Sequence, residues 1–244
     1  MFARQTVVSP FVRGKELMFG VSVTAAVIEQ EKSRNELLNE LVEFPDGGFY
    51  LRIHHSGDAA YSQYGDRAVI RGLREVVTSL HENDRDVTLP QLGLLGWAMT
   101  AFGADAFGSG IEATTQRCCE PRGGGGSNSP LERYFVPQLL SYVLRSDIPQ
   151  LQGVGAFETC RCPFCATLLQ PRRPWDHNQA GQHFLWSCCQ LASEMPTDVA
   201  NRAEALQTRL AAAAELRDAL QSAGRHLDAQ SEPKHLASWL EALT

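Results

Sequence analysis

Three cysteines lie within one short segment, Cys160-Arg-Cys162-Pro-Phe-Cys165. Thiolates are ligands that Zn²⁺ prefers, and a zinc site that stabilises a fold holds its ion with four ligands in a tetrahedron. Pro163 favours a tight turn, so the three sulfur atoms can converge on one ion. The segment therefore predicts a metal site that takes its fourth ligand from further along the chain.

Four residues after this segment are candidates for the fourth ligand: His177, His183, Cys188 and Cys189. We favour His183, because it begins an apolar helical stretch (His183-Phe184-Leu185-Trp186) that can fix the imidazole ring. Four protein ligands leave no position for water, so the site would be structural rather than catalytic. Iron in place of zinc, or three reduced cysteines in a loop, stay open as alternatives. We interpret Cys188-Cys189 and Cys118-Cys119 as small buried hydrophobic residues.

The composition is ordinary for a globular protein with a core: of 244 residues, 43% are hydrophobic and 20% are charged. It excludes a collagen and a disordered acidic tail. No apolar run approaches the roughly 20 residues that span a bilayer, and Met1 to Lys15 lack the pattern of a secretory signal. We therefore expect a cytoplasmic protein without membrane contact. Seven cysteines in that compartment favour a metal over a disulfide framework.

A basic patch flanks the cysteines. Because the formal net charge is −6, any contact with nucleic acid must be local. Arg161, Arg172 and Arg173, with Trp175 beside them, suit contacts to phosphates and bases. A solvated surface, on which the arginine stems lie over Trp175, is the alternative.

Hydrophobic patterning before residue 110 alternates between strands and helices, which is typical of βα units and a parallel sheet. A (β/α)8 barrel takes about 250 residues, so this part of the chain holds about half of one. The predicted fold class is therefore α/β, a partial (β/α) TIM-type barrel that stays open or is completed by a second chain. The predicted elements are a strand within 6–22, helices over 24–42, 66–82 and 94–102, and strands over 49–53, 87–89 and 104–107.

Residues 120–130 (EPRGGGGSNSP) are typical of a flexible loop or linker, because their glycines are not followed by the Lys-Ser/Thr of a P-loop. Helices are expected over 131–144 and 197–223, and after Pro233. The predicted organisation is a half barrel (1–119), a Gly/Ser-rich loop (120–130), a zinc-binding subdomain (131–195) and a C-terminal helical region (196–244).

The spacing Cys-x-Cys-x2-Cys, followed by His183 at the head of a helix, resembles the zinc site of the tRNA-guanine transglycosylases. Those enzymes are (β/α)8 barrels that carry a zinc subdomain after the last strand. Here Gly103 to Ser109 (Gly-Ala-Asp-Ala-Phe-Gly-Ser) is similar to the family's last-strand motif, Gly-x-Asp-x-Phe-Asp-Cys. The resemblance covers approximately residues 47–195. It implies Zn²⁺ as the cofactor and tRNA or DNA as a partner.

The departures from the family pattern matter as much as the matches. The family's nucleophile is the Asp of the Phe-Asp pair, and Gly108 stands at the matching position. A glycine cannot attack the ribose C1′. The family's Gly-Gly-Leu-Ala-Val-Gly-Glu loop has no clear counterpart, and the early barrel is missing. The resemblance therefore implies a protein that lacks the nucleophile and acts with a partner chain, or a second copy, which completes the barrel and supplies carboxylates for base exchange.

Several polar residues stand at what would be the C-terminal mouth of this barrel, where active sites of the architecture lie. His54 and His55 follow a predicted strand, and Gly108 and Ser109 follow the last one. These four are candidate substrate-binding residues. The candidate substitute carboxylates are Asp58, Asp66 and Glu112.

Two other functions stay open. A non-catalytic zinc-stabilised scaffold or nucleic-acid adaptor would have its sheet edge capped within the chain, whereas a partner-completed enzyme would have an apolar open edge. A small phosphate-ligand enzyme would instead hold an anion with the backbone N–H groups of Gly108-Ser109-Gly110.

Overall fold

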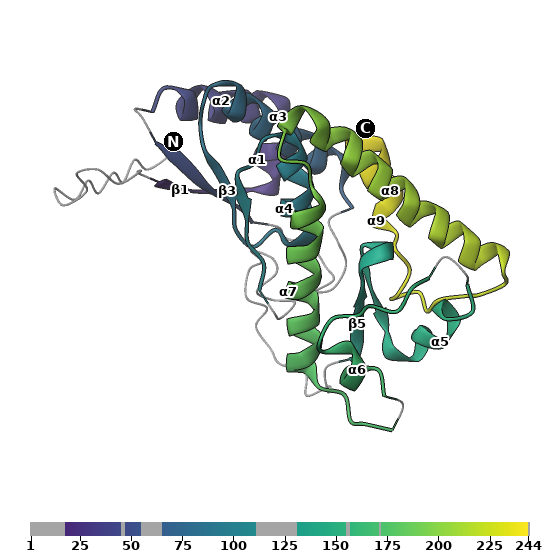
Figure 1. Ribbon diagram of the computed structural model, residues 1–244. Helices are drawn as coiled ribbons and strands as arrows, with labels where there is room; N and C mark the ends of the chain where they lie inside the picture. Colours follow the sequence, from purple (N-terminus) through teal and green to yellow (C-terminus); the bar gives the residue numbers. More distant parts are fainter. Residues whose placement is uncertain are drawn as a thin grey trace, which may run out of the picture.

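The structure, a computed structural model, describes residues 18–44, 47–54, 65–110, 131–154, 157–170 and 172–243 (Figure 1). The first part alternates strands and helices: β1 (Met18–Thr24), α1 (Ala25–Glu29), α2 (Glu31–Val42), β2 (Gly48–His54), α3 (Arg67–Glu82), β3 (Val87–Leu89), α4 (Gly93–Met99), the 3-10 turn η1 (Thr100–Phe102) and β4 (Ala106–Phe107). The second part contains β5 (Arg133–Val136), η2 (Pro137–Leu139), β6 (Ser141–Leu144), η3 (Arg145–Asp147), α5 (Ile148–Leu151), α6 (Cys165–Leu168), α7 (His177–Glu194), α8 (Val199–Ser222) and α9 (His235–Leu243).

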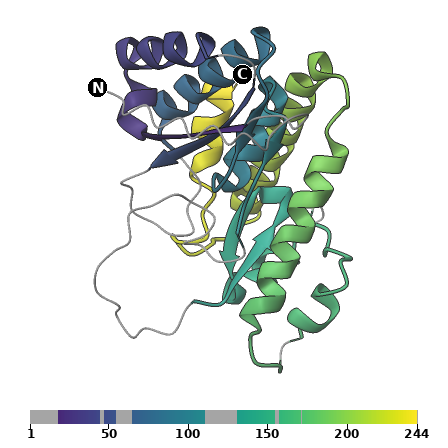
Figure 2. The same cartoon turned by 90° about the vertical axis from the view of Figure 1, so that its left-hand side faces the viewer.

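Four parallel strands form one sheet in the order β1-β2-β3-β4. Along β2 the side chains alternate: Phe49, Leu51 and Ile53 are buried, whereas Arg52 between them is exposed. The buried side faces helices α1, α2 and α3, which lie together on one side of the sheet (Figure 2). The α/β class and the parallel sheet are therefore confirmed, and the half barrel stays a prediction.

The helices of this part follow the predicted pattern with one break. The helix predicted over 66–82 is confirmed as α3, whose first turn is capped by Asp66 accepting hydrogen bonds from the N–H groups of Ala68 and Val69. The helix predicted over 24–42 is divided into α1 and α2, because Gln30 adopts an extended backbone. Arg34 stabilises the break by donating to the carbonyl of Ile28 at 2.9 Å.

The prediction of a helix over 131–144 was wrong, because these residues form the antiparallel hairpin β5–β6. The run Tyr134-Phe135-Val136 is aromatic and β-branched, which favours a strand. Pro137 then begins η2, and Leu140 reverses the chain with a left-handed φ of 50°. Aromatic side chains face both sides of this hairpin, so it has two buried faces.

Two hydrophobic cores lie on either side of the hairpin. The sheet core contains the buried face of the sheet together with Phe135 and Phe184, and the hairpin core contains Tyr134, Cys162 and Cys165. Helix α8, predicted over 197–223 and confirmed, crosses both cores (Figure 1). Its leucines divide accordingly, with Leu206 and Leu210 in the sheet core and Leu216 and Leu220 in the hairpin core.

The C-terminal helix α9, expected after Pro233, packs against α3 of the first part of the chain. Arg67 on α3 forms an ion pair with Glu241, and Arg74 donates to the carbonyl of Ala242 at 3.4 Å. The C-terminal helix is therefore joined by direct contacts to α3, in the first part of the chain. Within the described ranges, no helix is both long and apolar enough to span a bilayer.

Candidate metal centre

The three predicted cysteines and the favoured histidine come together at the edge of the hairpin core. The sulfur atoms of Cys160, Cys162 and Cys165 and a ring nitrogen of His183 all lie within 4.8 Å of one another. The Nδ1 atom of His183 is 3.3 Å from the sulfur of Cys162 and 3.4 Å from that of Cys165. The spacing of the cysteines and the apolar neighbours of His183 thus selected four side chains that the fold brings together.

Local backbone structure aims the sulfur atoms at one point. Cys165 begins α6, and its N–H donates to the carbonyl of Cys162 at 3.3 Å, which closes a turn around Pro163. The N–H of Cys162 in turn points to the sulfur of Cys160 at 3.4 Å. The sulfurs of Cys162 and Cys165 are 3.3 Å apart, far beyond the roughly 2.05 Å of a disulfide bond. The cysteines are therefore free thiols.

His183 comes from α7, but its place in the helix differs from the prediction. The helix begins at His177 after the cap Asp176, so His183 lies in its second turn rather than at its head. This position faces inward, and the His183 side chain is fully buried. Of the other candidate fourth ligands, His177 and Cys189 are exposed, and Cys188 is buried in the sheet core.

The hairpin holds the histidine in the form that a metal requires. The Nε2–H of His183 donates to the carbonyl of Phe135 at 2.7 Å. Because a carbonyl only accepts, this bond leaves the lone pair on Nδ1, which faces the sulfurs. Tyr134 stacks on the imidazole with ring centroids 4.5 Å apart, and its hydroxyl is 3.1 Å from the sulfur of Cys165. These contacts fix both the tautomer and the orientation of the ring.

Burial disfavours the charged forms of three side chains at this site. It raises the pKa of the Cys160 and Cys165 thiols above their ordinary value and lowers the pKa of His183. Burial, and then the hydrogen bond with Cys165, raises the pKa of Tyr134, so its hydroxyl stays protonated and can donate to the sulfur. A divalent cation would have the opposite effect and lower the pKa of the thiols, because a coordinated thiol loses its proton.

The donor set fits a structural metal. Three sulfurs and one imidazole nitrogen match the Cys₃His zinc sites, in which no coordination position is left for water. In a zinc tetrahedron the ligand atoms are roughly 3.6 to 3.8 Å apart. The observed contacts of 3.3 and 3.4 Å are a few tenths shorter, so a small outward shift admits the ion. The arrangement can therefore fasten 160–165 to α7, and it offers no open position for chemistry.

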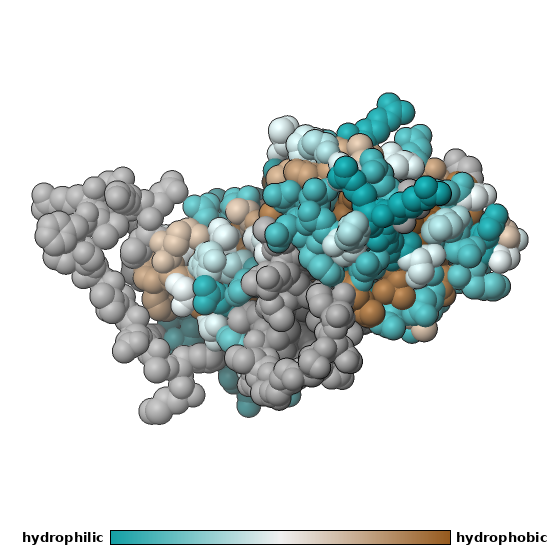
Figure 3. Space-filling view, turned by 90° about the horizontal axis from the view of Figure 1, so that it is seen from below, coloured by the Kyte–Doolittle hydropathy of each residue, from teal (hydrophilic) through white to brown (hydrophobic). Residues whose placement is uncertain are grey.

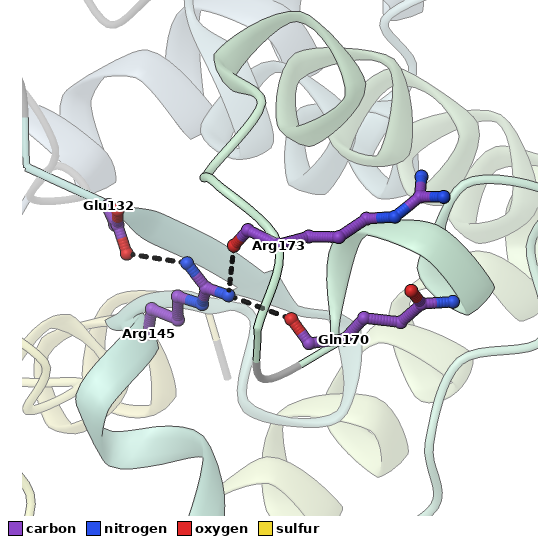
Figure 4. Close-up of polar contacts among 4 residues, drawn as sticks. All are labelled: Glu132, Arg145, Gln170 and Arg173. Carbon is purple, nitrogen blue, oxygen red and sulfur yellow. Dashed lines mark hydrogen bonds and ion pairs between the residues drawn. The ribbon is translucent and has the colours of Figure 1, made fainter.

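Arg145, which the sequence did not single out, organises the chain that follows the cysteines (Figure 4). Its guanidinium donates to the carbonyls of Gln170 and Arg173 at 2.9 and 2.8 Å and forms an ion pair with Glu132 at 3.0 Å. It also lies 5.4 Å from the ring centroid of Trp175. The aromatic residue of the predicted basic patch is thus covered by Arg145.

The arginines of the predicted basic patch are on the surface. The side chain of Arg173 points away from Arg145 (Figure 4), and both Arg172 and Arg173 are exposed. Arg161 lines a cleft of about 390 Å³, together with Cys160 and the exposed Trp186. Seen from the end that carries α6, the described surface is mainly hydrophilic with small hydrophobic patches between (Figure 3).

The predicted substrate-binding residues lie at the carboxyl ends of the strands, as far as they are described. His54 ends β2, and its Nε2 is 3.0 Å from the hydroxyl of Ser22 on β1. Gly108 follows β4, and its N–H donates to the carbonyl of Leu89 at 2.9 Å. Ser109 contacts the carbonyl of Gly110 at 3.5 Å. His55, like the carboxylates Asp58 and Glu112, falls outside the described residues.

Two aspartates have structural partners. Asp66 caps α3 as described above, which explains its position without a catalytic role. Asp105 accepts a hydrogen bond from the N–H of Val87 at 2.7 Å, at the amino end of β3. Both carboxylates are therefore engaged in local backbone hydrogen bonds.

Comparisons of this chain with protein-family models, with curated proteins and with solved structures returned no match. The function is therefore argued from the geometry of the sites.

Proposed function

We propose that this chain is a zinc-containing, transglycosylase-like protein that contributes half of a (β/α) barrel and acts with a partner chain in guanine exchange on tRNA or DNA. In this arrangement Zn²⁺ is structural and holds the segment 160–165 against α7. The partner chain supplies the remaining strands and the attacking carboxylate.

One observation supports the proposal: four parallel strands follow one another in chain order, and among the described residues helices cover only one side of the sheet. Its parallel strands follow one another in chain order, as neighbouring strands of a (β/α) barrel do. Parallel sheets are normally buried on both faces. Here the second face carries half-buried or exposed side chains from β1 and β2, Arg52 among them. A partner that continues the sheet would enclose this face.

The residues at the strand ends support a model in which this chain contacts the substrate and the partner chain supplies the nucleophile. Gly108 has no side chain with which to attack, and two described aspartates, Asp66 and Asp105, accept hydrogen bonds from backbone N–H groups elsewhere. His54 at the end of β2 can contact a bound base but cannot form the glycosyl intermediate of this family by the carboxylate route. On the described residues we therefore assign the nucleophile to the partner; Asp58 and Glu112 lie outside those residues.

The test uses the tagged chain, isolated with its bound proteins from the cells that make it naturally. We expect this complex to exchange radiolabelled guanine into tRNA or DNA, and the purified chain alone to give no exchange. Exchange by the chain alone would show that no partner is needed for the reaction. No exchange by the complex would overturn the transglycosylase proposal. Metal analysis of the same samples reports separately on the zinc site.

A non-catalytic zinc-stabilised adaptor is the second candidate, and one observation favours it. All four ligands of the metal centre come from this chain, and α7 and α8 pack into both cores without help from a partner. The phosphate-ligand enzyme has less support, because the N–H of Gly108 already donates to Leu89 within the sheet and is not free to bind an anion.

A further inference from the structure

The uncovered side of the sheet carries a group of polar and aromatic side chains, which we call the open-face patch. Its members come from three neighbouring strands and point away from the sheet core. They are Ser22, Thr24, Tyr50, Arg52, His54 and Thr88.

Strand register places these residues next to one another. Ser22 is aligned with Arg52, and Tyr50 is aligned with Thr88 on the following strand. The guanidinium of Arg52 lies 5.3 Å from the ring centroid of Tyr50, and the hydroxyl of Ser22 is 3.0 Å from the His54 ring. The patch is thus one continuous surface with an aromatic ring, a cation and hydroxyl groups.

Small neighbours leave this surface accessible. Gly20, on β1, is aligned with Tyr50 on one side, and Ala106, on β4, is aligned with Thr88 on the other. Both are exposed, and nothing lies within 4 Å of the position that a Cβ atom of Gly20 would take. A flat molecule can therefore approach the ring of Tyr50 from these strands.

The charge of the patch is positive, although the whole chain carries a net charge of −6. Strands β1 to β4 contain no acidic residue. Among the described residues no ion pair to Arg52 is seen, and its guanidinium lies over the ring of Tyr50. An exposed arginine beside an aromatic ring and hydroxyl groups is complementary to a ligand that joins a phosphate to a flat base.

We propose that the open-face patch binds a nucleotide unit of single-stranded nucleic acid. Arg52 pairs with the phosphate, the ring of Tyr50 provides a stacking surface for the base, and the hydroxyls of Ser22 and Thr24 bond to the sugar-phosphate. The inference rests on the proposed function and deepens it, because it assigns nucleic-acid contact to this chain rather than to the partner alone. Thr24 and His54, at the carboxyl ends of β1 and β2, would then lie nearest the mouth of the completed barrel.

The test measures binding of a fluorescein-labelled, single-stranded 12-nucleotide RNA, and of its DNA counterpart, to the purified full-length chain by fluorescence anisotropy at low salt. We expect Arg52→Ala to weaken binding about tenfold and to reduce the slope of log affinity against log salt by about one, the value for one lost phosphate contact. Tyr50→Ala should weaken binding by about five- to tenfold through lost stacking, and Tyr50→Phe should bind normally.

Arg71→Ala is the matched control, because Arg71 is an equally exposed arginine on α3, on the opposite side of the sheet. The proposal is overturned if the wild-type chain binds neither oligonucleotide, or if Arg71→Ala weakens binding as much as Arg52→Ala. Competition separates the ligand classes: guanosine monophosphate should displace the oligonucleotide at lower concentration than inorganic phosphate. Equal displacement by the two would reduce the patch to a simple anion site and overturn the nucleotide assignment.

The binding test and the exchange assay can give opposite results, so they test the two proposals separately. Binding by the isolated chain without exchange in the complex would retain the patch and remove the transglycosylase reaction. Exchange in the complex without binding by the isolated chain would retain the reaction and assign nucleic-acid contact to the partner.

Discussion

The metal centre encloses its polar groups, whereas the open-face patch leaves the Arg52 guanidinium exposed. At the metal centre the His183 ring is bonded through Nε2, stacked on Tyr134 and in contact with two sulfurs. On the sheet, Arg52 is exposed, and its guanidinium lies 5.3 Å from the ring centroid of Tyr50. Both sites contain an aromatic ring beside a nitrogen-bearing side chain, but only the first is enclosed.

We therefore distinguish residues of the metal centre, which maintain the fold, from residues of the open-face patch, which are available to bind a ligand. A buried polar group without its partner costs about 1–3 kcal/mol or more, so each ligand at the metal centre matters for stability. Exposed side chains away from such features usually change stability by less than about 0.5 kcal/mol. Substitutions should therefore affect stability at the first site and binding at the second.

The largest effect is expected for Cys162→Ser. Loss of one thiolate should remove the metal, and metal binding contributes about 10–16 kcal/mol in small zinc domains. We expect one zinc ion per chain in the wild type, close to none in the variant, and a melting temperature lower by about 10 °C or more. Elemental analysis and thermal unfolding measure both.

Cys189→Ser is the matched control, because Cys189 is exposed and lies outside the cluster. It should retain the metal and the wild-type melting temperature. Equal metal content in wild type and Cys162→Ser would show that the cluster is not the metal site.

Two adjacent residues of β2 allow the buried and the open face of the sheet to be compared directly, with a smaller expected loss of stability than at the metal centre. Leu51 is fully buried in the sheet core, and Leu51→Ala should cost about 2–5 kcal/mol of unfolding free energy. Arg52→Ala, one residue further along and on the other face, should cost less than about 0.5 kcal/mol. Denaturant unfolding measures both values. A large loss in Arg52→Ala would mean that the open face is covered within the chain.

Arg145→Ala is expected to destabilise the hairpin side of the molecule by about 1–2 kcal/mol. The substitution leaves the carbonyls of Gln170 and Arg173 without their charged donor, and hydrogen bonds to charged groups contribute about 1.5–3 kcal/mol when protected from water. The ion pair with Glu132 adds little to the free energy of unfolding, because the Glu132 side chain is exposed to water.

Hydrogen exchange of residues 172–176 measures the effect of Arg145→Ala locally, and elemental analysis measures its effect on the metal. We expect faster exchange with the zinc retained. Loss of zinc in Arg145→Ala would place Arg145 among the residues that position the ligands.

Tyr134→Phe should leave the fold intact and change only the affinity for the metal. The ring that stacks on His183 is retained, and only the hydroxyl that contacts the Cys165 sulfur is lost. Removal of a group that supports a metal ligand typically lowers metal affinity by 10- to 100-fold. Competition with a zinc chelator measures this change. Unchanged affinity would limit Tyr134 to packing.

The metal ligands could be predicted from the sequence because most of the information is local. Cys160, Cys162 and Cys165 are separated by a turn, and their types specify the chemistry. His183 was favoured because its neighbours were apolar, which is a weaker argument but identified the inward face of α7. The alternation of buried and exposed residues in 49–53 likewise predicted β2 and its two faces.

The environment of the metal ligands could not be predicted, because it depends on contacts distant in sequence. Phe135 and Tyr134 lie 48 and 31 residues from their partners at the centre. The hairpin that carries them was taken for a helix, since Leu140 turns the chain in a left-handed conformation without the Gly or Asn that normally signals one. The four strands gave no sign of what completes the sheet, so the half barrel is still a prediction.

The smallest effect concerns two adjacent thiols on α7, outside the cluster. Burial raises the pKa of Cys188 to about 12, whereas Cys189 is exposed. Because a thiol reacts as its thiolate, at pH 8 only about one Cys188 in ten thousand is reactive. We expect iodoacetamide to modify Cys189 and to leave Cys188 intact, which tandem mass spectrometry of the digested protein resolves.

The rate at which iodoacetamide modifies Cys188 should increase with pH. A thiol whose pKa is raised by folding stabilises the fold below the unfolded pKa of about 8.5, and this contribution is lost as the pH rises toward 12. Alkylation of Cys188 should therefore accelerate about tenfold per pH unit above 8, and it should match Cys189 in denaturant. Equal rates in the native protein at pH 8 would show that α7 is not packed against the sheet core, and the inward placement of His183 on the same helix would then lose its support.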